Sequence, residues 1–492
     1  MTDEDDRGLA RRLRAYESRV PDAPAPSTTL ARRLPWMPVL AAGAAVVAVV
    51  AGAWMSGMLD RQPDVGETDA SPTPSIDAGP TGEPNPSLIA EPSTSTPVAS
   101  ATPEPTLGPI VRWATAASFG SDGNAEEVLD ISYGGGHFIA VGFREPLNAR
   151  GQVGPSQREA LIWISTDGAA WEELPLGPEF EGAEVLATAA LPDGAAAIYG
   201  FVDSNPDPSD EEIGAAAWSS TDGRTWTRYE LALPARPDSP IAPFISSVTD
   251  GAKGYLTLDT YATDDGLVTE LWYSSDGARW EVVNRFATDS SGWTISVRDV
   301  GAGDEGFVLV GERYEVDAEQ REYEPIVQAS ADGRTWIDAN PNAMPAGPNL
   351  LVAAVHGDWI VTQTDFETST DITWFSHDGL TWEQRQGLEV PVPADAEDLG
   401  EGTVAVIGRI VEAGDRAFIS GALVYCCHGP WFAAGVWSSF DASSWEKLGF
   451  PDDAVIAAAA VHDGVTVLAG HTGATPTDDW KANATFWVSE RR

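Results

Sequence analysis

The sequence predicts an all-β fold, a seven-bladed β-propeller of four-stranded antiparallel blades, preceded by one transmembrane helix. Three observations predict the propeller. A turn motif recurs at a spacing of about 50 residues, an alternating apolar run recurs seven times, and the chain ends on half a motif. Repeats of this length are typical of architectures in which each repeat is one supersecondary unit.

The turn motif is a nine-residue segment with a central aspartate and a final tryptophan. The six copies are WISTDGAAW (Trp163–Trp171), WSSTDGRTW (Trp218–Trp226), WYSSDGARW (Trp272–Trp280), QASADGRTW (Gln328–Trp336), WFSHDGLTW (Trp374–Trp382) and WSSFDASSW (Trp437–Trp445). Asp-Gly between strand residues favours a two-residue hairpin loop with φ > 0 at both positions. In such a hairpin Ser219 faces Trp226, so Trp218 and Trp226 lie on opposite faces of the blade.

The aspartates of this motif are expected to be structural, because a turn carboxylate usually accepts hydrogen bonds from backbone amides. They are Asp167, Asp222, Asp276, Asp332, Asp378 and Asp441.

Each motif is preceded by an alternating apolar run that follows a glycine or aspartate, and a further apolar run comes before it. The seven alternating runs are Gly136–Phe143, Gly194–Phe201, Gly254–Tyr261, Gly306–Arg313, Gly357–Thr364, Gly414–Gly421 and Gly464–His471. One unit is therefore strand A, turn, strand B, loop, strand C, Asp-Gly turn, strand D.

The two ends of the repeat region complement each other. The chain ends on WVSERR from Trp487, which lacks a D strand, whereas the region begins with an unmatched strand, Ile110–Phe119, that contains Trp113. We expect this N-terminal strand to complete the seventh blade and close the ring, which leaves no open sheet edge. The propeller then spans residues 110–492.

Three segments precede the propeller. Residues 1–33 are polar and rich in arginine, and they are expected to form a cytoplasmic tail. Residues 34–59 are uncharged and long enough to cross a bilayer, and the arginines before them place the N-terminus in the cytoplasm. Residues 60–109 are rich in Pro, Ser and Thr, which predicts a disordered stalk outside the membrane. The alternative is a cleaved export signal, with Ala51-Gly52-Ala53 as its cleavage site.

Composition argues against some partners. The chain has 75 acidic and 29 basic residues, a formal net charge of −46, which excludes a nucleic-acid-binding protein because phosphates require clustered Lys and Arg. The only cysteines, Cys426 and Cys427, are adjacent, so they form a vicinal disulfide or remain two thiols. With His428 they supply fewer than the four ligands of a structural zinc site.

The repeated turn resembles the Asp-box (BNR) motif, S-x-D-x-G-x-T-W, found in propellers such as the sialidases. It departs from that motif because Asp and Gly are adjacent in SSTDGRTW. The resemblance covers residues 110–492 and implies the fold. Sialidases also carry an F-R-I-P start, an arginine triad and a Tyr–Glu nucleophile pair. Here IVRW stands at Ile110–Trp113 and no triad can be assigned, so the resemblance implies no glycosidase activity.

Function is expected on the face opposite the Asp-Gly turns, where the B-to-C loops are long and acidic. Three interpretations remain open for these loops. They are solvated surface, they bind calcium, or they supply paired carboxylates for glycoside hydrolysis. Asp203, Asn205 and Asp207 match the start of a calcium loop, although Pro208 and Gly214 replace its glycine and final glutamate.

The B-to-C loop of blade six is aromatic rather than acidic. Tyr425, Trp431 and Phe432, with His471 of blade seven, are the predicted ligand-binding residues, and packing at the mouth of the channel is the alternative.

These observations favour a membrane-anchored extracytoplasmic propeller that binds a protein or glycan ligand without catalysis. The first alternative is an exported glycan-active hydrolase of sialidase-like fold. The second is a transmembrane sensor coupled to a cytoplasmic regulator. No catalytic residue is assigned, and no cofactor is expected other than calcium.

Overall fold

A computed structural model of the chain describes residues 112–489 except 121–122, 147–157, 204–212, 237–242, 264–265, 289–291, 316–322, 340–349, 366–369, 387, 389–402, 426–431, 442–443, 452 and 474–481. The predicted tail, transmembrane segment and stalk lie outside these residues, so they stay predictions. In the part of the chain that is described, no helix is long and apolar enough to cross a membrane.

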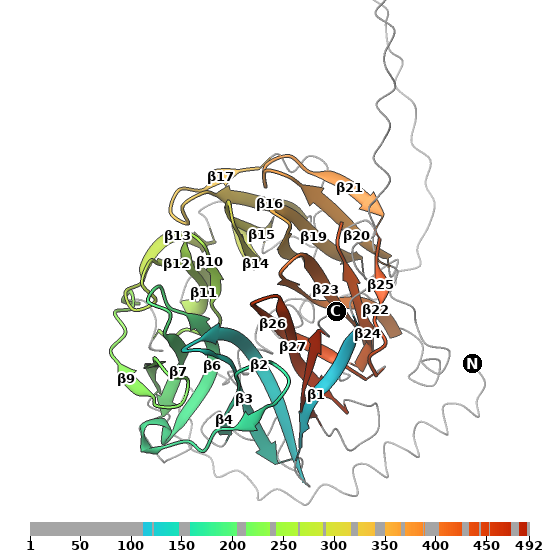
Figure 1. Cartoon of the computed structure of the whole chain (residues 1–492). Coiled ribbons are helices and arrows are strands. Elements are labelled where there is room, and N and C mark those ends of the chain that lie inside the picture. The colour runs from blue at the N-terminus through green and yellow to red at the C-terminus, as the bar shows by residue number, and fades with distance from the viewer. Residues whose placement is uncertain are drawn as a thin grey trace, which may run out of the picture. The chain divides into compact units, whose positions relative to one another are not determined.

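The described chain forms seven four-stranded antiparallel sheets arranged as the blades of a propeller (Figure 1), which confirms the predicted seven-bladed propeller. Blades 1 to 3 are β2 (Asn124–Gly134), β3 (His137–Pro146), β4 (Glu159–Ser165), β5 (Glu172–Glu173); β6 (Ala183–Ala190), β7 (Ala196–Asp203), β8 (Ile213–Ser220), β9 (Thr227–Tyr229); and β10 (Thr249–Gly251), β11 (Gly254–Thr263), β12 (Gly266–Ser274), β13 (Glu281–Ala287). Blades 4 to 6 are β14 (Trp293–Gly303), β15 (Gly306–Glu315), β16 (Tyr323–Ser330), β17 (Ile337–Asp338); β18 (Leu350–Val355), β19 (Asp358–Asp365), β20 (Thr370–Ser376), β21 (Glu383–Gln386); and β22 (Thr403–Ala413), β23 (Arg416–Tyr425), β24 (Phe432–Ser439), β25 (Glu446–Lys447). Blade 7 is β26 (Val455–His462), β27 (Val465–Thr472), β28 (Asn483–Ser489) and the N-terminal strand β1 (Trp113–Phe119), and one 3-10 turn, η3 (Pro178–Phe180), joins blades 1 and 2.

The ring closes as the sequence predicts. Strand β1 pairs antiparallel with β28, from Trp113 opposite Ser489 to Phe119 opposite Ala484. The Trp113 ring contacts Phe418 of blade 6 at 5.4 Å. Because the first and last strands of the propeller share one sheet, blade 7 has four strands like the others.

The core lies in the seams between successive blades. The tryptophans near the end of strand C in blades 1, 2, 3, 5 and 7 are no more than 1% exposed: Trp163, Trp218, Trp272, Trp374 and Trp487. The seam between blades 1 and 2 packs Ile139 and Ile162 against Trp218 and Trp226. Each blade is thus apolar on both faces, as a sheet sandwiched between two neighbours requires.

Five of the seven innermost strands carry a β-bulge opposite a glycine of strand B. The glycines are Gly142, Gly200, Gly311, Gly421 and Gly470. A Cβ atom on Gly142 or Gly200 would lie 1.9 Å from the carbonyl oxygen of Glu127 or Glu184. In blade 5 the equivalent residue is Gln363, and the pairing of β18 with β19 runs without a register shift. The glycine is therefore what makes room for the bulged backbone.

The A-to-B and C-to-D turns lie at one end of the ring, which we call the Asp-turn face. A Cβ on Gly135, in the first A-to-B turn, would meet the backbone nitrogen of Gly223 in the Asp turn of blade 2 at 2.8 Å. Strand β1 enters the ring from the same face, because Trp113 lies beside Ser489 at the turn end of β28. Most of the breaks in the described chain fall in the opposite rim of B-to-C and D-to-A connections.

Candidate functional site

The six Asp turns are organised by the aspartate carboxylate, which we take from blade 2 as the example. Asp222 Oδ1 accepts hydrogen bonds from the amides of Arg224 (2.9 Å) and Thr225 (2.7 Å), and from the hydroxyl of Ser220 (3.0 Å). Amide hydrogen bonds of this kind hold the pKa values of Asp167, Asp222 and Asp332 below the usual range of an aspartate. The expectation that these carboxylates are structural agrees with this geometry.

The predicted two-residue hairpin is wrong. Trp218 pairs with Arg228 and Ser219 with Thr227, so the connection runs from Ser220 to Trp226. Of the central Asp and Gly only Gly223 has a positive φ, 69°. The Asp222 carboxylate accepts hydrogen bonds from the amides of the residues two and three positions further on. These bonds stabilise a longer turn than the predicted two-residue hairpin loop.

The predicted placement of the two tryptophans is wrong for the same reason. The Phe180 ring contacts both Trp218, at 4.8 Å, and Trp226, at 6.3 Å. Both indoles therefore lie in one seam, between blades 1 and 2, rather than on opposite faces of the blade. The turn contains more residues than a two-residue hairpin. The faces of the sheet on which the following side chains lie therefore differ from those that the hairpin predicts.

The glycine that follows each aspartate packs against the preceding blade. A Cβ at these glycines would come within 2.5–2.8 Å of a side chain there: Val467 for Gly168, His137 for Gly223, Tyr199 for Gly277, Tyr273 for Gly333 and Val308 for Gly379. The copy in blade 6 is the exception, because Ala442 follows Asp441. The sixth of these seams, between blades 5 and 6, therefore has no glycine at this position of the turn.

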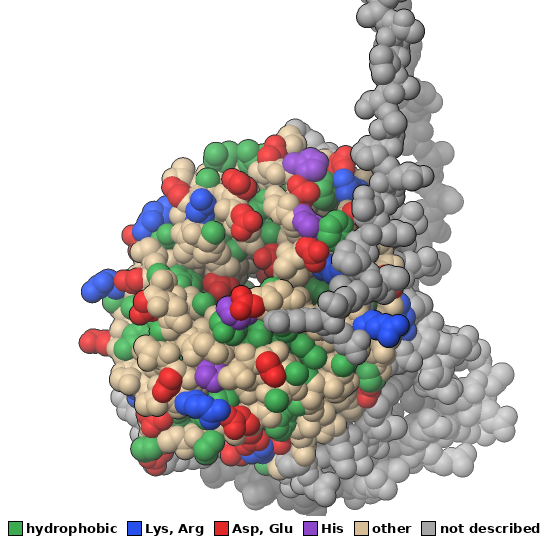
Figure 2. Space-filling view, viewed as in Figure 1, with side chains coloured by type: hydrophobic (Ala, Val, Ile, Leu, Met, Phe, Trp, Pro, Cys, Tyr) green, Lys and Arg blue, Asp and Glu red, His purple; other side chains and the backbone are tan. Residues whose placement is uncertain are grey.

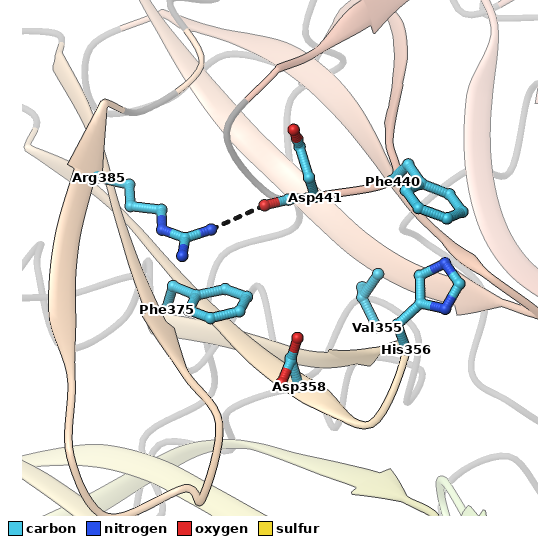
Figure 3. A pocket seen from close by; sticks show the side chains of 7 residues that line it. All are labelled: Val355, His356, Asp358, Phe375, Arg385, Phe440 and Asp441. Carbon is cyan, nitrogen blue, oxygen red and sulfur yellow. Dashed lines mark hydrogen bonds between the residues drawn. The ribbon is translucent and has the colours of Figure 1, made fainter. Parts of the chain in front are cut away.

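A hollow of about 250 Å³ lies at that sixth seam, between blades 5 and 6 on the Asp-turn face (Figure 3). Blade 5 supplies most of its lining, and blade 6 supplies two residues of its Asp turn. The lining residues are Val355, His356, Asp358, Phe375, Arg385, Phe440 and Asp441. We call this hollow the seam pocket.

Two departures from the repeat, His356 and Phe440, meet at the seam pocket, and a third, Ala442, follows Phe440 by two positions in the sequence. Phe440 and Ala442 stand where the turn motif of blades 1 and 2 has Thr and Gly. His356 has a φ of 56° in an A-to-B turn where blade 1 has Gly135, so a non-glycine side chain holds a left-handed conformation. The His356 ring lies 4.0 Å from the Phe440 ring. Residues that depart from the repeat and from ordinary backbone conformations at one place are typical of a site that serves a function other than folding.

The polar groups of the seam pocket are fixed by its own contacts. The Arg385 guanidinium lies 3.5 Å above the Phe375 ring and donates to the carbonyl oxygen of Asp441 at 2.9 Å. It also donates to the Glu383 carboxylate at 2.6 Å. On the opposite side of the pocket, one oxygen of Asp358 contacts Nδ1 of His377 at 2.5 Å.

A second group of charges surrounds the axis of the ring, where Figure 2 shows an opening with acidic side chains around it. After the bulge of blade 1, Asp130 accepts a hydrogen bond from the Thr188 amide of blade 2 at 2.9 Å. Asp299 of blade 4 makes the same contact with Val352 of blade 5, also at 2.9 Å. Arg409 occupies the equivalent post-bulge position in blade 6.

These axial acids have raised pKa values. Burial among the inner strands raises the pKa of Asp130 to about 7 and that of Glu412 to about 8, although the amides of Thr188 and Ala354 oppose the shift. The positive charge of Arg409 lowers the pKa of Asp130, whereas the negative charge of Asp250 raises the pKa values of both Asp130 and Glu412. The Glu412 residue is exposed, so water offsets part of its desolvation, and we assign the larger effect on stability to Asp130.

We predict that stability falls as the pH rises from 5 to 8. An unfolded Asp or Glu ionises near pH 4. Groups with raised folded-state pKa values contribute stability that is full below about pH 4 and is lost through about pH 7 to 8. The Asp turns act in the opposite sense, since amide hydrogen bonds outweigh burial and lower the pKa of Asp378 to about 2. Calorimetry across this range should give the highest melting temperature near about pH 4–6.

The control for this pH profile is the double variant Asp130→Asn with Glu412→Gln. Its melting temperature should depend less on pH between 5 and 8 than that of the wild-type chain, whatever its absolute value. An unchanged slope would show that other groups set the profile.

Buried ion clusters lie at the rim end of blades 1 to 4, and sequence patterns did not indicate them. Glu126, 1% exposed, pairs with Arg144 at 2.8 Å, and Arg298 pairs with Glu312, which is fully buried. In blade 3, Tyr261 donates to Glu270 at 3.0 Å beside the Arg236–Asp259 pair. Asp259 lies opposite Glu270 in the pairing of β11 with β12. The sequence shows both carboxylates but not this register, so it could not predict that they come together.

The blade 3 cluster is closed to a substrate. Asp259, Glu270, Tyr261 and Arg236 are each 5–8% exposed. Trp272 donates to the second oxygen of Glu270 at 3.1 Å. Both oxygens of Glu270 are thus occupied, as expected for a structural ion cluster.

The predicted ligand-binding residues are placed only in part. Tyr425 ends β23, Phe432 begins β24, and His471 lies half-buried in β27, whereas Trp431 lies outside the described residues. Asp203 ends β7, and Asn205 and Asp207 fall in an undescribed stretch, as do Cys426 and Cys427. No group of three His, Cys, Asp or Glu side chains in the described ranges is arranged to hold a metal ion. The aromatic site and the calcium site therefore stay predictions.

No family model and no curated protein matches the chain. Among solved structures, the chain is similar to a protein of unknown function from Dyadobacter fermentans, with 13% identity, a TM-score of 0.42, and coverage of 77% of this chain and 99% of that one. It is also similar to the phage phi92 endosialidase (10% identity, TM-score 0.37, 77% and 69% covered) and to the Trypanosoma rangeli sialidase in complex with the inhibitor DANA (14%, 0.33, 74% and 55%). At these identities and TM-scores the similarities carry no conclusion about activity.

Proposed function

We propose that the chain is a membrane-anchored extracytoplasmic propeller that binds a ligand without catalysing a reaction, and that the seam pocket is a binding site. In this proposal residues 34–59 anchor the chain and residues 60–109 hold the propeller away from the membrane. The observation that carries the binding function is the contact of His356, which has a positive φ, with Phe440 at one seam. In the sequence, Ala442 follows Phe440 by two positions and replaces the glycine of the repeat.

A non-enzymatic role is supported by the contacts of the described carboxylates. Those of the Asp turns accept hydrogen bonds from backbone amides, and buried carboxylates at the rim, such as Glu126 and Glu312, pair with arginines. Glycoside hydrolysis needs two carboxyl groups that both reach the substrate. Asp259 and Glu270, which lie opposite each other, do not meet this requirement because both are buried.

The experiment compares the full-length chain with a variant that restores the repeat, Phe440→Thr with Ala442→Gly. A fluorinated fragment library is screened against both by ligand-observed NMR. We expect a set of fragments that bind the wild-type chain and fail to bind the variant. The variant should be at least as stable as wild type, because Thr and Gly occupy these positions in blades 1 and 2.

Two outcomes would contradict the proposal. Fragments that bind both chains equally would remove the seam pocket as a site. Hydrolysis of reporter glycosides by the wild-type chain, abolished by Glu270→Gln, would instead support the hydrolase alternative.

A further inference from the structure

We propose that the seam pocket takes the side chain of a lysine, presented by a basic segment of a partner protein, with its ammonium group against Asp358. This inference rests on the proposed binding function and adds to it the chemical class of the ligand. It is carried by the open carboxylate oxygen of Asp358, by the neutralised state of Arg385, by the size of the pocket and by the charge of the chain.

Asp358 is the available acid of the seam pocket. Its side chain is 29% exposed, and one of its oxygens contacts His377. Within the described residues the other oxygen has no hydrogen-bond or ion-pair partner, and the side chain points toward the space between Phe375 and Val355 (Figure 3). A single open oxygen suits the compact ammonium of lysine better than the planar guanidinium of arginine, which binds a carboxylate through both oxygens.

Arg385 does not oppose a cationic ligand strongly. Its Nε and Nη2 atoms donate to the Glu383 carboxylate at 2.9 and 2.6 Å, and Nη1 donates to the Asp441 carbonyl oxygen at 2.9 Å. Its charge is therefore paired, and Figure 3 shows Nη1 directed across the pocket to Asp441. The guanidinium also covers one face of Phe375, which leaves the apolar surface of the pocket to the methylene groups of a lysine.

The size of the pocket admits a lysine side chain. That side chain has five non-hydrogen atoms, one fewer than benzene, which a cavity of about 150 Å³ can hold. The hollow of about 250 Å³ is therefore large enough for its methylene groups and its ammonium group.

The charge of the whole chain favours a basic partner. A formal net charge of −46 produces a long-range potential that attracts cationic segments and raises their association rate. That attraction is not specific to one site, so the pocket must supply the selectivity between lysine and other side chains.

The test uses the full-length chain and three tripeptides, N-acetyl-Gly-X-Gly-amide with X = Lys, norleucine or Arg, titrated by saturation-transfer NMR at fixed ionic strength. We expect the lysine peptide to bind at least about tenfold more tightly than the norleucine or arginine peptide. Asp358→Asn should reduce its affinity to that of norleucine. Asp463→Asn, which removes an 81% exposed carboxylate from another A-to-B turn, should leave the affinity unchanged.

The outcomes separate this inference from the proposed function. Equal binding of the lysine and norleucine peptides, both lost in Phe440→Thr with Ala442→Gly, would overturn the lysine assignment and keep the binding site. Equal loss of affinity in Asp358→Asn and Asp463→Asn would reveal general charge attraction and would also overturn the assignment. If neither the peptides nor the fragment library bind, both proposals fail.

Discussion

The Arg298→Leu variant is expected to lose about 3–5 kcal/mol of its free energy of unfolding. The Arg298 side chain is 5% exposed, its partner Glu312 is fully buried, and Nε of the arginine donates to Glu312 at 2.7 Å. Removal of the arginine leaves a buried carboxylate with no countercharge, and burial already raises the pKa of Glu312. Urea denaturation of the full-length chain, followed by tryptophan fluorescence, measures the loss.

The fold itself supplies the matched control for this variant. Leu129 and Phe143 of blade 1, and Leu186 and Phe201 of blade 2, occupy the two positions that Arg298 and Glu312 occupy in blade 4, and they form an apolar cluster. The double variant Arg298→Leu with Glu312→Phe should therefore recover most of the lost stability. If the double variant is as unstable as the single one, the loss comes from packing rather than from the unpaired charge.

The Gly200→Ala variant is expected to lose about 3 kcal/mol, since its added methyl group overpacks a rigid site. The Cβ atom would lie 1.9 Å from the carbonyl oxygen of Glu184 and 3.1 Å from Cα of Val185. These are backbone atoms of the bulge, so they can move only if the pairing of β6 with β7 changes. Thermal denaturation should show a lower melting temperature.

Gly214→Ala, in the same blade, is the control for Gly200→Ala. A Cβ at Gly214 meets no atom within 4 Å. Replacement there should leave stability unchanged or raise it by about 0.4–1 kcal/mol through the unfolded state. Equal melting temperatures for the two alanine variants would show that the bulge does not need its glycine.

Periodic features of this fold could be predicted from the sequence. The recurrent apolar runs fix the number of blades, and the half motif at Trp487 with the extra strand around Trp113 fixes the closure, because both follow from counting. The shape of the turn could not be predicted in the same way. The local preference of Asp-Gly for a tight hairpin is weaker than the hydrogen bonds from Arg224 and Thr225 to Asp222.

The seam pocket could not be predicted, although each of its unusual residues is visible in the sequence. Ala442 replaces the glycine of the motif, and nothing in the sequence shows that this glycine packs against the preceding blade in the other five copies. His356 and Phe440 are 84 positions apart and contact each other only because blades 5 and 6 are neighbours in the ring. The buried pairs at the rim, such as Arg298–Glu312, depend on the register of the bulge, which the alternating pattern does not define.

The closing strand has a mechanical consequence. Tension applied to the chain at Trp113 is transmitted to the propeller through β1, which is held by six residue pairs with β28. A pull directed outward from the Asp-turn face acts along β1, so it shears these hydrogen bonds together instead of opening them one after another. The strand that closes the ring is thus also its tether, and it is attached in the direction in which a β-sheet resists force best.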